Sequence, residues 1–197
     1  MRPIREGGGI GLIWNQLDFQ GNHQLLMGQD VAGTLSVFAG KRGPIGVAVT
    51  ADGEWAFGDR GLFRRYIAIQ SGGVDLGRYV QSSDKLSGNL RIPTVPAYSW
   101  SREEAPTLHW SFHDPLPLEV VHFTGHSLQE RPSGILTARV DLDPLALDRP
   151  ETPLLVMLCG YLVARGDDKP VVTRARPDGD MKLYRELMEG RTTSPPL

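Results

Sequence analysis

TPLLVMLCGYLVARG, the stretch from Thr152 to Gly166, decides the fold that we expect for this 197-residue chain. Thr152 is a typical N-cap residue, and Pro153 occupies the first helical turn, where proline is tolerated. Gly166 is a typical residue at the end of a helix. The stretch therefore predicts a helix over about residues 153–165.

Apolar residues cover the whole circumference of this predicted helix. No charge occurs between Glu151 and Arg165. The side chains expected to form a structural core are Leu154, Leu155, Met157, Leu158, Leu162 and Val163. A helix that is apolar on every side must be surrounded by protein or by lipid. About thirteen helical residues reach only about 20 Å, short of the roughly 30 Å of a bilayer core, so we expect protein to surround it.

The chain before this helix consists of short apolar or alternating runs, separated by Gly, Asp, Asn and Pro. Such runs at a spacing of about ten residues are typical of an antiparallel barrel or sandwich. The expected strands are Leu25–Met27, Thr34–Ala39, Ile45–Thr50, Trp55–Phe57, Arg65–Gln70, Val74–Val80, Leu86–Ile92, Leu108–Phe112, Leu118–Phe123 and Ile135–Val140. The predicted fold is mainly β, a closed antiparallel barrel of about 12 short strands that encloses a central hydrophobic C-terminal helix.

The length and texture of the chain predict one domain with two flanking segments. We expect a flexible N-terminal lead over residues 1–23, with room for a first strand. The barrel is expected over residues 24–170. A charged C-terminal tail follows over residues 171–197, with a short helix at 181–188.

Charge and cysteine content restrict the classes of function. A net charge of −2 does not favour nucleic acid as a partner, because binding of nucleic acid depends on neutralising phosphates with Lys and Arg. The one cysteine, Cys159, excludes an internal disulfide and fits a reducing compartment. The N-terminus lacks the pattern of a secretory signal, and no transmembrane segment is expected. We therefore expect a cytoplasmic protein.

Three segments resemble the tubby-like barrel superfamily, which includes tubby proteins, phospholipid scramblases and LURP-one-related proteins. They are DGEWAFGDRGLFRRYIAIQSGGVDLGRYV (52–80), LHWSFHDPLPLEVVHF (108–123) and DRPETPLLVMLCGYLVAR (148–165). The resemblance covers roughly residues 24 to 166, and the compact length is closest to the LURP-one-related and scramblase-like members. It implies a non-enzymatic binding or scaffolding module, without a cofactor, for an anionic lipid headgroup or another small anion. Such a module would lie in the cytoplasm or at the membrane periphery.

A group of basic residues is the candidate site for an anion. Its members are Lys41, Arg42, Arg60, Arg64 and Arg65. Attraction to an anionic membrane is worth about 1 kcal/mol per basic residue, so five would give about 5 kcal/mol, slightly better than millimolar affinity. Asp59 lies within the group and would lower its charge. A solvated rim of a hairpin is the simpler interpretation.

A hydrolase is the alternative from a different functional class. The sequence GHSL at residues 125–128 resembles part of the turn that exposes a nucleophilic serine, here Ser127. Its fifth position is Gln129 instead of glycine, and all five histidines precede Ser127, whereas the hydrolase fold places its histidine last. We therefore name no catalytic residue.

A metal-dependent hydrolase that uses histidine ligands is a second form of the hydrolase alternative. His109 and His113 are four residues apart, about 13 Å along a strand, which is too far to share a metal. Pairing between strands could bring one of them near His122, with Asp114 or Glu119 as a third ligand. Ordinary surface histidines are the simpler interpretation, and no metal is assigned. A third alternative is a protein-interaction domain whose partner binds the C-terminal tail.

Overall fold

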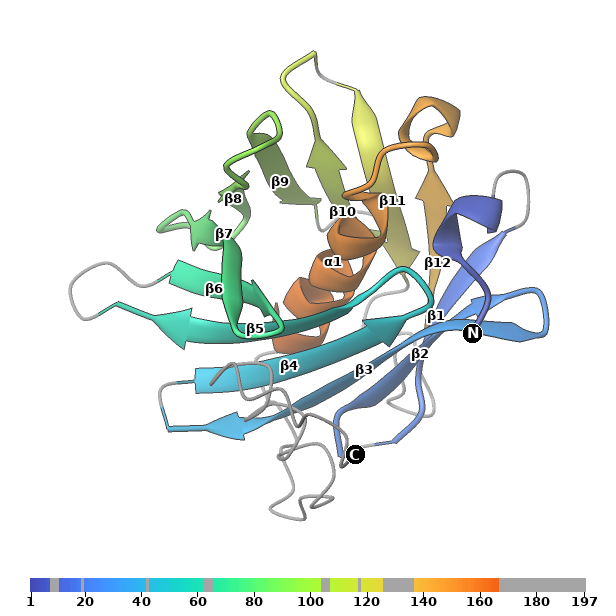
Figure 1. Cartoon of the computed structure of the whole chain (residues 1–197), viewed down its shortest axis with the longest axis horizontal. Helices are drawn as coiled ribbons and strands as arrows, with labels where there is room; N and C mark the ends of the chain where they lie inside the picture. The colour runs from blue at the N-terminus through green and yellow to red at the C-terminus, as the bar shows by residue number, and fades with distance from the viewer. Residues whose placement is uncertain are drawn as a thin grey trace, which may run out of the picture.

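Antiparallel strands close into a barrel around α1 (Thr152–Gly166), the long helix of the described part of the chain (Figure 1). The computed structural model describes residues 1–7, 11–18, 20–41, 43–61, 66–103, 107–116, 118–125 and 137–166. Each of the twelve strands pairs with its neighbours in sequence, and the last strand closes on the first. The predicted fold class, a closed antiparallel barrel with a central hydrophobic helix, is confirmed.

The strands are β1 (Leu12–Gln16), β2 (Asn22–Met27), β3 (Asp30–Gly40), β4 (Gly43–Thr50), β5 (Glu54–Arg60), β6 (Tyr66–Ser71), β7 (Val74–Gln81), β8 (Ser87–Arg91), β9 (Tyr98–Glu103), β10 (Leu108–His113), β11 (Glu119–Gly125) and β12 (Thr137–Leu142). Two short 3-10 helices, η1 (Ile4–Gly7) and η3 (Pro144–Ala146), precede β1 and α1 respectively.

Ten of these strands overlap the ten runs expected from the sequence, β1 lies in the N-terminal segment that left room for a first strand, and β9 was not predicted. β9 has the sequence YSWSRE, in which buried Tyr98 and Trp100 alternate with polar residues. Two aromatic side chains are enough to bury one face of a strand, although they do not form an apolar run. β1 follows a run of glycines and has the same design, with Leu12 and Trp14 fully buried.

The side chains of α1 are enclosed by the barrel wall. All six expected core residues are buried, from fully buried Leu155, Met157 and Leu158 to Leu154 at 5% exposure. The helix packs against β3, β4, β5, β10 and β11, which lie on different sides of it. Each such side chain contributes about 1.5–3 kcal/mol by burial. No helix among the described residues is both long and apolar enough to span a bilayer.

Polar contacts attach the N-terminal end of α1 to the barrel rim. Thr152 Oγ1 donates a hydrogen bond to the carbonyl oxygen of Ala146 in η3. Tyr98 OH donates to Glu151 Oε1 at 2.5 Å. Burial, together with this bond to Glu151, raises the pKa of Tyr98 to about 12, so its hydroxyl remains a donor at neutral pH. Arg149 Nη2 lies 2.9 Å from Asp114 Oδ2 at the same rim.

The N-terminal segment is more structured than the expected lead. Ile4 in η1 is fully buried, η1 packs against α1, and the Ile4 N–H donates to Asp52 Oδ2 at 3.0 Å. The barrel begins with Leu12 of β1 instead of residue 24, because β1 is needed to pair with β12 and close the sheet. The expected tail over 171–197 and its short helix at 181–188 lie outside the described residues.

Candidate functional site: a cationic groove outside the barrel

The structure places two of the five expected basic residues. Arg60 is exposed at the end of β5, and Lys41 is exposed in the turn between β3 and β4. The other three, Arg42, Arg64 and Arg65, lie outside the described residues. Asp59 does not lower the charge beside Arg60 as expected, because its carboxylate is 6% exposed and pairs with an arginine of α1.

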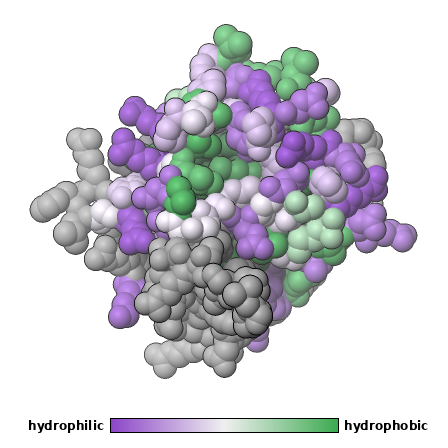
Figure 2. Space-filling model, viewed as in Figure 1, coloured by the Kyte–Doolittle hydropathy of each residue, from purple (hydrophilic) through white to green (hydrophobic). Residues whose placement is uncertain are grey.

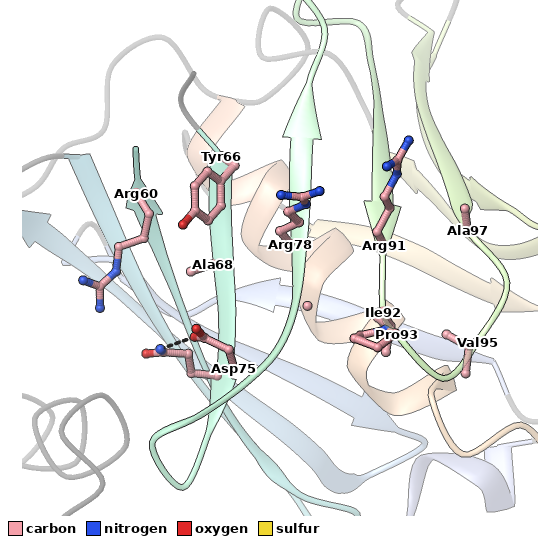
Figure 3. A pocket seen from close by; sticks show the side chains of 12 residues that line it. Arg60, Tyr66, Ala68, Asp75, Arg78, Arg91, Ile92, Pro93, Val95 and Ala97 are labelled. Atoms are coloured by element: carbon pink, nitrogen blue, oxygen red, sulfur yellow. Dashed lines mark hydrogen bonds between the residues drawn. The ribbon is translucent and has the colours of Figure 1, made fainter. Parts of the chain in front are cut away.

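A groove of about 780 Å³ runs across the outer surface of β5 to β8 and the segment that leads into β9 (Figure 3). Its volume is within the usual range for sites that bind small molecules. Arg60, Arg78 and Arg91 line it from three different strands, whereas Lys41 is not part of its wall. Of the members of the expected basic group that the structure describes, Arg60 alone lines this groove.

Strand register brings the arginines to one face of the sheet. Arg78 of β7 lies directly opposite Arg91 of β8, and Ala68 of β6 lies opposite Arg78 on the other side. The residues before or after them, Tyr79 and Leu90, are fully buried, so the arginines face outward. The small side chain of Ala68 keeps the floor of the groove low beside the two guanidinium groups.

The arginine side of the groove has unbalanced positive charge. Among the described residues, none forms a hydrogen bond or ion pair with the side chain of Arg60, Arg78 or Arg91, and all three side chains are exposed. Arg78 and Arg91 lie directly opposite each other on neighbouring strands. Like charges in such positions repel each other and destabilise the sheet. An anion bound between them would remove this repulsion.

Asp75 is the carboxylate of the groove, and it is engaged with Gln70. Gln70 Nε2 donates to Asp75 Oδ1, and the two residues lie opposite each other on β6 and β7. Gln70 is 8% exposed, and its Oε1 has no hydrogen-bond donor among the described residues. Asp75 therefore lies on the wall at the Gln70 end of β6 and does not neutralise the arginines.

The sequence interpretation did not single out Arg78 and Arg91. Each stands beside one buried residue of an alternating strand, as ordinary surface residues do. The available signal was the expected pairing of Val74–Val80 with Leu86–Ile92, which are adjacent in sequence. The pairing of these two runs does not by itself place the two arginines face to face, because that also depends on the register of the hairpin.

A second polar cluster lies on the outside of β10 and β11. His109 Nδ1 is 2.8 Å from His122 Nε2, and Glu119 Oε2 is 3.3 Å from His122 Nδ1. His113 lies apart from this pair, where its Nε2 contacts the hydroxyls of Ser111 and Ser101. Pairing of β10 with β11 therefore brings His109 close to His122, as the sequence analysis allowed.

The described residues do not assemble the metal site of the hydrolase alternative. Asp114, one expected third ligand, pairs with Arg149 instead of a histidine. No group of three or more His, Cys, Asp and Glu side chains in the described ranges is arranged to hold a metal ion. Ser127, on which the serine version depends, lies outside those ranges.

No family model, curated protein or solved structure matches this chain.

Proposed function

We propose that this chain is a tubby-like barrel, closest to the LURP-one-related and scramblase-like members, and that it is a non-enzymatic binding or scaffolding module. The support for this proposal is the twelve-strand barrel around a buried helix, together with the three resembling segments at 52–80, 108–123 and 148–165. The module would act in the cytoplasm, at the periphery of a membrane.

The proposed ligand is an anionic group, the phosphate of a lipid headgroup or a free small anion, bound in the cationic groove. The observation that carries this proposal is the facing pair of Arg78 and Arg91, which has no partner of opposite charge among the described residues. Guanidinium groups bind phosphate oxygens through strong charge-assisted hydrogen bonds. Arg60 adds a third positive charge at one end of the groove.

Nonspecific attraction alone would be too weak for this role. Three arginines near an anionic surface contribute about 3 kcal/mol, which is weaker than millimolar affinity. Hydrogen bonds to a charged group contribute about 1.5–3 kcal/mol each. A phosphate held by two guanidinium groups would therefore bind more tightly than the surface charge predicts.

Co-sedimentation with vesicles tests the proposal. Phosphatidylcholine vesicles that contain a phosphorylated anionic lipid should bind the protein, and pure phosphatidylcholine vesicles should not. The double variant Arg78→Ala/Arg91→Ala should bind at least about 100-fold more weakly, because each arginine contributes about 1.5 kcal/mol or more through a hydrogen bond to the charged phosphate.

Arg139→Ala is the matched control, because Arg139 is an exposed arginine on β12 that pairs with Asp141 away from the groove. It should bind like the unmodified protein. An equal loss of binding free energy per arginine in the two variants would indicate a general charge effect, and no loss in the double variant would overturn the proposed site.

A further inference from the structure

The two ends of the cationic groove differ in chemistry. In Figure 3 the guanidinium groups of Arg78 and Arg91 lie toward the upper edge of the groove with Arg60 at its left, whereas Ile92, Pro93 and Val95 line its lower right. Figure 2 shows apolar surface next to hydrophilic side chains in the region of β7, where this groove lies. A ligand that fills the groove therefore meets both cationic and apolar walls.

The apolar end is a fixed surface of the protein. β8 ends at Arg91, and Pro93 cannot continue the ladder because it lacks an N–H. The Val95 N–H donates to the Ile92 carbonyl oxygen at 3.3 Å, which closes a turn. Ile92 and Val95 pack partly on the core while also lining the groove. This wall is therefore formed before any ligand binds.

Asp75 determines which way an anionic ligand would lie. Its carboxylate lies toward the lower edge of the groove in Figure 3, as Ile92 and Pro93 do, whereas the guanidinium groups of Arg78 and Arg91 lie above it. An anion at that end would be repelled by Asp75, whereas the facing guanidinium groups of Arg78 and Arg91 attract it. The apolar end is thus left for an uncharged part of the ligand.

We propose that the groove binds a single-chain anionic amphiphile as a monomer. Its phosphate or carboxylate head lies among Arg60, Arg78 and Arg91, and the first part of its chain covers Ile92, Pro93 and Val95. This inference rests on the proposed anion-binding function and adds the chemical class of the ligand. A volume of about 780 Å³ is sufficient for a small head and part of a chain.

Binding of decyl phosphate and methyl phosphate, measured by calorimetry below the micelle concentration, tests the inference. Burial of one methylene strengthens binding about fourfold. Decyl phosphate should therefore bind at least tenfold more tightly than methyl phosphate. Arg78→Ala/Arg91→Ala should weaken both ligands, because it removes the contacts to their shared head.

Val95→Ser tests the chain, and Val80→Ser is its matched control. Val80 is an exposed valine of β7 that does not line the groove. Val95→Ser should reduce the preference for decyl phosphate at least threefold and leave methyl phosphate unchanged, which also shows that the variant is folded. Val80→Ser should change neither affinity.

The outcomes separate this inference from the proposed function. If decyl phosphate and methyl phosphate bind with equal affinity, and Arg78→Ala/Arg91→Ala weakens both, the ligand is not an amphiphile but the proposed anion site is retained. Binding to vesicles that contain the phosphorylated lipid, without binding of monomeric decyl phosphate, would likewise overturn the amphiphile inference and retain the anion site. Equal binding of decyl phosphate and decyltrimethylammonium, or binding that the arginine variant does not weaken, would overturn both. Absence of binding to all of these probes would also overturn both.

Discussion

Arg165, in the last turn of α1, forms a double hydrogen bond with Asp59 of β5. Arg165 Nη1 lies 2.7 Å from Asp59 Oδ1, and Nη2 lies 3.0 Å from Oδ2. The two side chains are 24% and 6% exposed, so most of this ion pair is removed from water. The end of the central helix is thus attached to the barrel wall by a charge pair, whereas the sequence interpretation had placed Asp59 within the basic group.

Asp59→Ala should destabilise the protein by about 3 kcal/mol, because it leaves the guanidinium of Arg165 partly buried without its partner. Urea unfolding at neutral pH measures this change. Asp141→Ala, which removes the acid of the exposed Arg139–Asp141 pair, should cost less than about 1 kcal/mol. Similar effects of the two substitutions would contradict the structural role of the Asp59 pair.

Gly160→Ala should destabilise the protein by about 1–3 kcal/mol through overcrowding. A Cβ atom at Gly160 would lie 2.2 Å from Cη2 of the fully buried Trp14. Helix propensity alone predicts the opposite sign, a gain of about 1 kcal/mol. Gly11→Ala is the control, because an added Cβ there meets no atom within 4 Å. Thermal unfolding of the three proteins decides between packing and propensity.

His23 should make the protein less stable in acid. Burial lowers the pKa of His23 from 6.5 to about 4, against a smaller opposing effect of Asp18. The unfolded chain therefore binds a proton between these pH values while the folded protein does not. The contribution of His23 to stability is complete above pH 6.5 and falls by roughly 3 kcal/mol as the pH approaches 4.

Urea unfolding of the unmodified protein and of His23→Leu, from pH 7 to pH 4, measures this dependence. The stability difference between the two proteins should shift in favour of His23→Leu as the pH falls. A difference that does not change with pH would show that His23 is protonated equally in both states.

Cys159 should resist thiol reagents while the protein is folded. It is fully buried in α1, and burial raises the pKa of its thiol, so little thiolate forms and no reagent reaches it. A chromogenic disulfide reagent should label it only after unfolding in urea. Rapid labelling of the folded protein at neutral pH would mean that the barrel opens around the helix.

Arg78→Thr should raise stability slightly while it weakens anion binding. The substitution removes the repulsion between Arg78 and Arg91 and places a β-branched residue in β7, a gain of up to about 1 kcal/mol. High salt should reduce the part of this gain that comes from repulsion. A loss of stability instead would indicate that Arg78 serves the fold.

The architecture could be predicted well because it depends on local chemistry. An uncharged helix between Glu151 and Arg165 must be covered, and short alternating runs supply a sheet that can cover it. The miss was β9, whose buried face consists of Tyr98 and Trp100, and β1, with buried Leu12 and Trp14, was expected only as a first strand without bounds. A pattern based on apolar runs does not detect such strands.

The sequence interpretation named one residue that lines the candidate groove. The sequence drew attention to Arg60, but it could not pair Arg78 with Arg91, because alternation specifies the face of a strand and not its register. The same limit applies to His109 and His122, which meet only through the pairing of β10 with β11.

The sequence by itself determined that a wholly apolar helix would be enclosed by short strands, since burial of apolar side chains is a property of each segment's own residues. Only the tertiary structure decided which polar side chains meet on the outside of the barrel. Strand register and barrel closure bring distant residues together, as they do for Asp59 and Arg165, and local sequence patterns carry no information about those pairings.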